Sequence, residues 1–428
     1  MAPPARRYHR VRGTARIATA VLVALFTVLV GADLPAPAQA QAGTPADKIT
    51  TWFASLTPSW GATNVRLDAD GLRLGSSAAR PASLRSNQPE GTLLTEVHPL
   101  TEFSGQVTAE LTAVRSAGSA IALDVRGTRG DGSWTEWLPT GPTSPAMLGT
   151  TVTGVQARIV LRGGRGGVSP LVRSVRLTAK PGAALLAARP RRAPSYLVFA
   201  TREGLVGHRT ANGHVIHERD HFVALPSRRG LSPLDSGDYT VKICASSGRC
   251  EWAPVWDVGP WNTTDDYWNP PEARQSWPDL PQGQPQAQAA YEDAYHDGVD
   301  QFNREVLNPA GIDLADGTFW DGLGLRDNSW VTVTYLWTDG APPAIVQAPT
   351  LPVYSGPGKQ YPPVGLAAQR AALLVECTEA GQTVTGGQGS TDRWLRIGPK
   401  QFISAAYVTV QDTQKGTQHE PSKHCVTP

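Results

Sequence analysis

The sequence predicts a mainly β protein built from several domains. Its 428 residues include 43 Gly and 36 Pro, a composition typical of chains with many tight turns. Stretches such as QVTAELTAV and VRSVRLTA alternate apolar and polar residues, which is the period of a strand with one buried face. Charged residues make up only 18% and the net charge is +2, a balance that predicts neither nucleic-acid binding nor an acidic partner.

Residues 1–40 read as an export signal. An apolar run at 17–31 follows a basic segment, and Ala38-Gln39-Ala40 offers a small-residue cleavage site. The apolar run is shorter than the ~20 residues that a membrane span needs. We therefore predict a secreted protein, extracellular or associated with the cell wall, that has no membrane contact after cleavage. The Arg6-Arg7 pair is a weak mark of the twin-arginine route, and we favour the general route.

The four cysteines predict disulfides, because an even number in an exported chain is typical of them. Three pairings are possible. We predict Cys244–Cys250 and Cys377–Cys425, since each of these closes a local loop. The spacing does not match the paired C-x-x-C ligands of a metal site.

The first part of the mature chain divides into three segments by composition. Residues 41–90 are a Pro-, Ser- and Gly-rich lead-in with one short predicted helix, Asp47 to Leu56. Residues 91–182 show period-2 patterning between turn clusters, which predicts a β-sandwich. Residues 183–195 carry Pro, Ala and Arg and read as a linker. Within the predicted sandwich, Trp134 and Trp137 either stack on sugar rings or pack together in a core hairpin.

Residues 196–338 form the predicted main domain. Strand-like runs include SYLVFATREGLVG, YTVKICA and CEWAPVWDV, and a strong final strand covers Trp330 to Trp337. Asn212-Gly213 marks a tight turn between strands. Residues 262–311 are a polar insertion with a predicted helix from Ala287 to Val306.

Asp257 is the candidate acid of this domain. It lies at the end of an apolar run, just before the Gly259-Pro260 turn, and Trp252, Trp256 and Trp261 are close to it in sequence. An apolar wall disfavours an ionised carboxylate and raises its pKa, which suits a general acid. The alternative is a turn aspartate that accepts backbone hydrogen bonds.

Four separated pieces of this domain resemble the double-psi β-barrel of the rare lipoprotein A type, which is also the catalytic-domain fold of expansins. Thr210-Ala211-Asn212-Gly213 matches the motif T-A-[NS]-G, and FVALPS is similar to H-x-T-L-P-x-G. VWDVGPWN is similar to V-N-D-R-G-P-F, and GIDLADGTFWDGLGL resembles I-D-L-S followed by L-G-M. The resemblance covers about a third of the chain. Phe222 stands in place of the family's histidine, with His221 one residue earlier, and Val258 replaces an arginine.

The resemblance implies lytic transglycosylation of peptidoglycan glycan strands, with Asp257 as the single acid and base. Asp313, from the I-D-L piece, is the second candidate catalytic carboxylate; otherwise it caps a helix that begins near Leu314. If both carboxyls face one groove, hydrolysis is an additional possibility. The alternative function is non-catalytic, expansin-like binding and loosening of polysaccharide. The expected substrate-binding residues of the barrel are Thr210, Asn212, His221, Trp256 and Trp261.

Residues 346–412 resemble a bacterial SH3-like wall-binding module, through the pieces LPVYSGPGKQYPPVG and RWLRIGPKQFISAAYV. The resemblance implies a small β-barrel whose groove binds a peptide or a glycan. Its aromatic residues either bind that ligand, Tyr354 and Trp394 foremost, or pack a very small core. Residues 413–428 are a polar tail that Cys425 holds in place. Taken together, the expected partner is peptidoglycan or another wall polysaccharide, and the protein is expected to be a monomer.

We expect no metal centre and no cofactor. Four histidines fall within residues 208–221, but their positions along strands and a turn are not expected to converge on a metal. Asp265-Asp266 is expected to lie in a solvated loop, with a cation site or a helix cap as alternatives.

Overall fold

The computed structural model describes residues 49–76, 88–181, 193–339, 343–410 and 424–425. The predicted export signal lies outside these ranges. The chain from Asp47 onward clusters as one compact unit, and its described part is mainly β with three hydrogen-bonded sheets. Within the described residues, no helix has the length and the apolar character to cross a bilayer.

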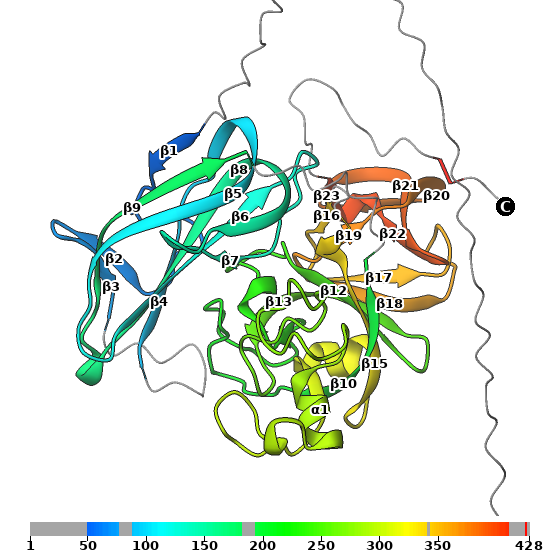
Figure 1. Cartoon of the computed structure of the whole chain (residues 1–428). Coiled ribbons are helices and arrows are strands. Elements are labelled where there is room, and N and C mark those ends of the chain that lie inside the picture. The colour runs from blue at the N-terminus through cyan, green and yellow to red at the C-terminus, as the bar shows by residue number, and fades with distance from the viewer. Residues whose placement is uncertain (1–48, 77–87, 182–192, 340–342, 411–423, 426–428) are drawn as a thin grey trace, which may run out of the picture. The chain divides into compact units, whose positions relative to one another are not determined.

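The N-terminal domain is a nine-stranded sheet (Figure 1). Its central order is β2-β3-β9-β5-β8-β6-β7, with β1 paired to β9 and β4 paired to β8. Apolar residues in alternating positions, such as Val155, Ala157 and Ile159, form its core. The strands are β1 (Thr50–Phe53), β2 (Val65–Asp68), β3 (Gly71–Leu74), β4 (Glu90–Leu94), β5 (His98–Val114), β6 (Ala120–Thr128), β7 (Leu138–Pro139), β8 (Ala146–Arg162) and β9 (Leu171–Lys180).

The predicted short helix at residues 47–56 is wrong. Thr50–Phe53 forms β1, which pairs antiparallel with β9. Strands β2 and β3 also fall within the span that we expected to be a lead-in, and they join the same sheet. Each of these strands is only four residues long. So short a strand carries little periodic signal of its own, and its pairing with β9 decides its structure.

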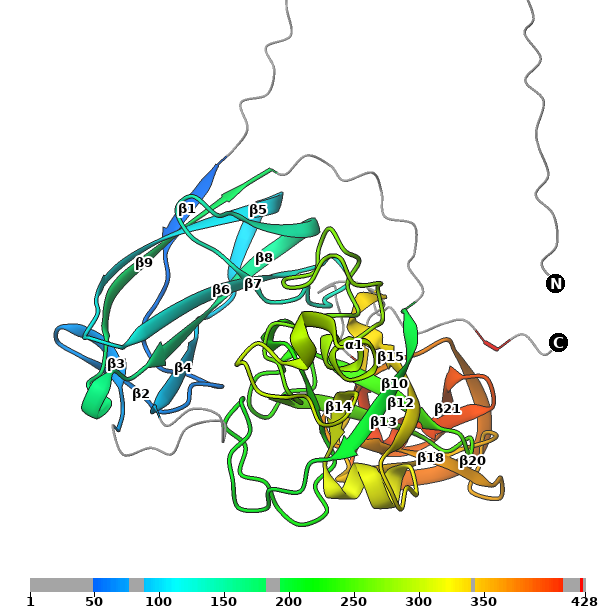
Figure 2. The ribbon, with the colours of Figure 1, turned by 60° about the horizontal axis from the view of Figure 1, so that its bottom comes forward.

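The central domain is a closed six-strand barrel. The strands follow one another around the ring as β11-β14-β10-β15-β12-β13, and pairing of β11 with β13 closes it. Strands β10, β12, β13 and β15 of the ring are labelled in Figures 1 and 2, and β14 in Figure 2. Alternate residues such as Val198, Ala200, Val223 and Leu225 fill the interior. The strands are β10 (Ser195–Arg202), β11 (Val223–Leu225), β12 (Thr240–Ala245), β13 (Cys250–Val258), β14 (Ala310–Leu314) and β15 (Ser329–Tyr335).

The polar insertion holds one α-helix, α1 (Gln286–Asp293). It ends at Ala294, which adopts the left-handed conformation with φ of 52°. The helix is therefore much shorter than the predicted span from 287 to 306. The other helical elements are single turns: η1 (Arg165–Gly167), η2 (Arg228–Gly230), η3 (Tyr295–Gly298), η4 (Thr318–Gly322), η5 (Leu336–Thr338) and η6 (Ala405–Tyr407).

The C-terminal domain continues the sheet of the barrel. Strand β18 pairs in parallel with β13, and a Cβ at Gly365 would come within 2.0 Å of the Cys250 carbonyl oxygen, so this approach requires glycine. Three of the strands, β16, β19 and β23, form a separate sheet. The strands are β16 (Pro343–Val346), β17 (Thr350–Tyr354), β18 (Pro363–Ala368), β19 (Ala372–Leu374), β20 (Cys377–Gly386), β21 (Gly389–Gly398), β22 (Gln401–Ser404) and β23 (Val408–Val410).

Both predicted disulfides are confirmed. Cys244–Cys250 joins neighbouring strands β12 and β13 of the barrel. Cys377–Cys425 links the start of β20 to a described piece of the C-terminal tail.

The N-terminal domain contacts the barrel through buried polar groups. Glu136 accepts hydrogen bonds from the indole N–H groups of Trp268 (2.6 Å) and Trp337 (3.0 Å). Trp137 is 1% exposed and packs into the barrel's core cluster, while the Arg126 guanidinium lies 3.8 Å from the ring centroid of Trp134. Trp137 therefore packs the domain junction, which leaves no ring face for a sugar.

Replacing Glu136 tests this junction. Glu136→Ala leaves two indole N–H groups without their charged acceptor, so we expect the free energy of unfolding to fall by about 2–4 kcal/mol. Glu136→Gln keeps one acceptor oxygen and should lose less. Chemical denaturation measures both, with Glu110→Ala as the control, because the Glu110 side chain is 58% exposed. Equal stability of Glu136→Ala and the unmodified chain would contradict the assignment.

Candidate functional site

A β-bulge in β13 sets the direction of the Asp257 side chain. Val223 of β11 pairs with Val255, but the next residue, Ala224, pairs with Asp257, so Trp256 is an extra residue in β13. Such a bulge changes the side to which the following residues point. Asp257 is therefore in register with Ala224, whose own position alternates with the core residues Val223 and Leu225.

The Asp257 carboxyl is buried and held on one oxygen. Its Oδ1 accepts hydrogen bonds from the backbone N–H of Ala211 (2.7 Å) and of Val258 (2.8 Å), and the residue is 8% exposed. Its side chain also hydrogen-bonds Glu203. Burial raises the pKa of Asp257, and these hydrogen bonds, together with the charge of Arg228, offset only part of that effect.

Sequence reasoning missed Glu203. It is half-buried and directly follows β10, and its backbone N–H donates to the Leu314 carbonyl of the neighbouring β14. The only signal in the sequence was an acidic residue at the end of an apolar strand. Nothing local showed that the loop after β10 brings it to Asp257.

Asp313 lies on the same register row as Asp257. Ala224 pairs with Asp257 on one side and with Asp313 on the other, and Asp313 pairs in turn with Thr201. Two inter-strand steps place the Cα atoms of the two aspartates roughly 10 Å apart. The Thr201 hydroxyl donates a hydrogen bond to Asp313. The alternative role of Asp313 as a helix cap is wrong, because η4 begins at Thr318.

Thr210 and Asn212 shape the hairpin that covers Asp257. They are 0% and 8% exposed. The Thr210 hydroxyl donates to Asn212 Oδ1 (2.7 Å), which also accepts from the backbone N–H of His214 (3.1 Å). Gly213 completes the turn with φ of 101°. The backbone N–H of Asn212 then donates to the Trp256 carbonyl (3.2 Å), which fixes the hairpin on the bulge.

The tryptophans do not form the expected wall around Asp257. Trp256 donates its indole N–H to the Ser236 carbonyl (2.8 Å) and stacks on Phe222. Trp261 donates to Asn308 Oδ1 (3.2 Å) and packs against the insertion. Trp252 belongs to the core of the C-terminal domain. Apolar contacts near Asp257 come instead from the cluster of Ala211, Leu231 and Val258.

His221 pairs with Glu251 of β13. Its Nδ1 lies 3.0 Å from Glu251 Oε1, and Glu251, which is 0% exposed, also accepts from the Thr318 hydroxyl. Burial opposes a charge on His221, but the hydrogen bond and charge of Glu251 outweigh it and raise the pKa of the imidazole. This pair links the residue just before β11 to Glu251 of β13.

Asp265 and Asp266 do not lie in a solvated loop, so that prediction is wrong. Both are buried, and they pair with Arg274 and Arg229 at 2.6 Å each. Asp265 also accepts from the backbone N–H of Gln286 at the start of α1 (2.6 Å), so the helix-cap alternative holds for it. Burial raises the pKa of Asp265 to about 6.

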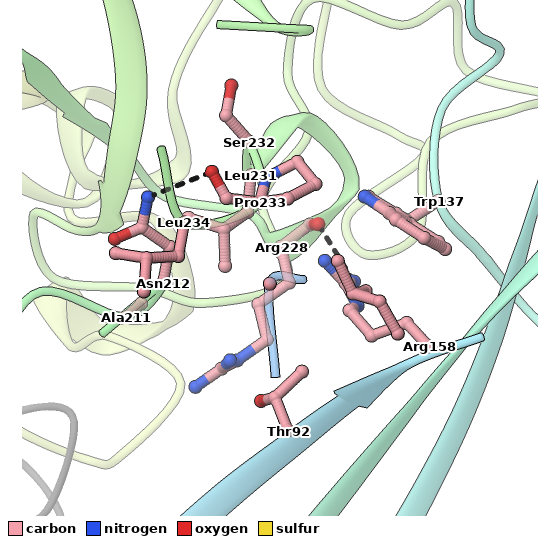
Figure 3. Close-up of a pocket in the computed structure, with 12 residues that line it drawn as sticks. Thr92, Trp137, Arg158, Ala211, Asn212, Arg228, Leu231, Ser232, Pro233 and Leu234 are labelled. Carbon is pink, nitrogen blue, oxygen red and sulfur yellow. Dashed lines mark hydrogen bonds between the residues drawn. The ribbon is translucent and has the colours of Figure 1, made fainter. Parts of the chain in front are cut away.

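A small cavity lies beside the hairpin (Figure 3). The barrel contributes Ala211, Asn212 and Arg228, and the N-terminal domain contributes Trp137 and Arg158. Arg158 donates to the Arg228 carbonyl (3.0 Å), and Asn212 donates to the Pro233 carbonyl (3.4 Å), as Figure 3 shows. Asp257 does not line this cavity. The cavity reaches Ala211, whose backbone N–H donates a hydrogen bond to the Asp257 carboxyl.

The C-terminal aromatics are mostly used in packing. Trp394 is 1% exposed and donates its indole N–H to the Gln382 carbonyl (2.9 Å), so it has no free face for a ligand. Tyr354 packs edge-on against it at 5.8 Å. Tyr354 is nevertheless partly exposed, and Tyr361 of the same domain is 39% exposed.

Three side chains that could ligate a metal do converge. His214, His217 and Asp220 place their ligand atoms within 4.8 Å of one another. The expectation that the histidines would not converge is wrong for these two, because a tight turn at residues 217–220 brings Asp220 back to them.

The His221–Glu251 pair predicts a pH dependence of stability. Because its pKa is raised in the folded protein, the pair stabilises fully below the ordinary value of 6.5, and this contribution is lost as pH rises through the raised pKa. Glu251→Gln should cost about 3 kcal/mol at pH 6 and clearly less at pH 9. Urea unfolding at both pH values checks this, with the exposed Glu218→Gln as control. A loss that is the same at both pH values would contradict it.

Residues 191–334 match the model of a domain of unknown function (DUF8814). The matched span contains five strands of the barrel and all but the last residue of the sixth, β15. No curated protein matches the chain. The barrel that holds Glu203, Asp257 and Asp313 is therefore similar to a recurring domain to which no activity has been assigned.

Proposed function

We propose that this is an exported, wall-associated protein that cleaves the glycan strands of peptidoglycan by acid–base chemistry in its central barrel. The closed six-strand barrel is compatible with the double-psi β-barrel of the rare lipoprotein A type, to which the T-A-N-G and D-x-G-P pieces are similar. The C-terminal domain is compatible with an SH3-like module. The two disulfides fit an oxidising, extracellular location.

The carboxyl pair of Glu203 and Asp257 carries the proposal. Two carboxyl groups hydrogen-bond to each other only when one of them is protonated. The pair therefore retains a proton that two separate, solvated carboxyls would lose, and the raised pKa of Asp257 agrees with this. A retained proton near neutral pH is what a general acid requires.

The two members of the pair have different roles in the proposal. Asp257 is fixed by two backbone N–H groups and positions the shared proton, whereas the more exposed Glu203 delivers it. The proton goes to the glycosidic oxygen as the bond from that oxygen to the anomeric carbon breaks. The carboxylate then takes the proton of the sugar's own C6 hydroxyl. The C6 oxygen bonds to the anomeric carbon, and a 1,6-anhydro end results.

Asp313 decides between this reaction and hydrolysis. Inverting glycosidases hold their carboxyls about 6.5–9.5 Å apart, with room for a water, whereas retaining enzymes hold them about 5–5.5 Å apart. The Cα atoms of Asp257 and Asp313 are roughly 10 Å apart across two inter-strand steps. Asp313 either takes part in hydrolysis through water or stabilises positive charge on the sugar ring.

The burial of Asp257 favours a second candidate function. With 8% exposure and one oxygen occupied by two N–H donors, Asp257 also fits a structural aspartate that fastens the hairpin. In that case the barrel binds polysaccharide without cleaving it, as expansins do. Phe222 and Val258, where the family pattern has a histidine and an arginine, support this alternative.

Digestion of purified peptidoglycan sacculi separates the two. Protein without residues 1–40 should release anhydro-muropeptides, and Glu203→Gln or Asp257→Asn should lower the rate by at least ~100-fold. Asp327→Asn is the control, since Asp327 is exposed and lies outside the pair. If the soluble products have reducing, non-anhydro ends and their release requires Asp313, the reaction is hydrolysis. Sacculus binding without soluble products, unchanged in Asp257→Asn, would establish the binder instead.

A further inference from the structure

The segment between the hairpin and β11 brings together two imidazoles and a carboxylate. His214 Nε2 lies 2.7 Å from Asp220 Oδ2, and His217 Nδ1 lies 3.7 Å from the same oxygen. All three ligand atoms fall within 4.8 Å of one another. The three residues come from only seven positions of the chain, yet they are neither on one strand nor on one helix.

The backbone holds this arrangement before any ligand arrives. Arg209 and Val215 form an antiparallel β-bridge across the hairpin. This bridge fixes the position of His214, the residue before Val215. The His217 backbone N–H donates to Asp220 Oδ2 (2.7 Å), and the Asp220 N–H donates back to the His217 carbonyl (3.3 Å). Arg219 completes this tight turn with φ of 63°. The carboxylate is therefore set at one place relative to both rings.

We infer that His214, His217 and Asp220 bind a divalent transition-metal ion, with zinc the best match, and leave one coordination position open. Two imidazoles with one carboxylate are a usual zinc ligand set, and three protein ligands leave a fourth position for water or an outside ligand. Tetrahedral bonds of about 2.0–2.1 Å separate ligand atoms by roughly 3.4 Å. The observed distances of 2.7 and 3.7 Å differ from this value by less than 1 Å, and the widest spacing in the cluster, at most 4.8 Å, would have to shorten by up to about 1.4 Å.

The surroundings support a bound ion. The ring of His214 lies 4.8 Å from that of Trp256 and 6.2 Å from that of Phe222, so an apolar wall covers one side of the site. Arg219, the nearest cation in sequence, instead contacts Asp321 at 3.3 Å. His217 is 69% exposed, so its ring can turn toward an ion at little cost in packing.

A plain hydrogen-bonded loop is the competing explanation, and His217 separates the two. In a loop without metal, the exposed His217 ring does almost nothing, and its removal changes nothing measurable. With a metal, the same ring supplies one of three bonds. The inference goes beyond the proposed glycan chemistry, although the ion would brace the hairpin whose Ala211 N–H holds Asp257.

Zinc binding to the purified, untagged chain tests the inference. Competition with a chromophoric chelator should give one zinc per chain, and His217→Ala should weaken the affinity by more than ~100-fold, beyond the loss expected for an outer-shell partner. His214→Ala should do the same. His208→Ala is the matched control in the same loop and should bind zinc normally.

Cobalt gives an independent readout. The Co²⁺-loaded chain should show the visible absorption of a four-coordinate ion, and His217→Ala should lose it. Because His217 is exposed, this variant should fold even if His214→Ala does not. Failure to bind zinc saturably at micromolar concentration, or binding unchanged in His217→Ala, would overturn the inference whatever the outcome with sacculi.

Discussion

Closure of the barrel by β11 is the constraint on which the candidate site depends. These three residues pair in parallel with β13 on one side and antiparallel with β14 on the other. Val223 and Leu225 fill the interior, and the small Ala224 stands between Asp257 and Asp313 on the register row. The bulge at Trp256 exists only relative to β11. Without this short strand, β13 would have no partner against which the bulge directs Asp257, whereas Asp313 is also held by its pairing with Thr201 of β10.

The buried acids of the barrel and its insertion differ in what compensates them. Asp265 and Asp266 each contact an arginine, and Glu251 contacts His221. A buried charge that is paired with an opposite charge is stable, but it is not available for proton transfer. Asp257 is different, because its side-chain partner is another acid, Glu203. The charge of Arg228 acts on Asp257 only from further away, and Arg228 itself forms an ion pair with Glu90. Titratable groups that repel each other while buried are typical of functional sites.

The sequence predicted what depends on local patterns. Alternation and turn residues indicated a mainly β chain, and short loops indicated both disulfide pairings. It failed where partners distant in sequence decide. Four-residue β1 is a strand only because β9 pairs with it. The helix that was predicted to continue past residue 293 ends there, because the backbone of Ala294 adopts the left-handed conformation. Glu203 meets Asp257 through the fold alone, and Trp256 and Trp261 turn to partners at Ser236 and Asn308.

Strand β13 belongs to two domains at once. Its barrel neighbours are β12 and β11, and Cys250 to Trp252 also pair with Gly365 to Ala367 of β18. The barrel and the C-terminal domain therefore share backbone hydrogen bonds at this strand, where a flexible tether is the ordinary link between domains. A chain cut just after the barrel would leave the outer edge of β13 bare. An unpaired edge recruits strands from other molecules, so such a fragment should self-associate.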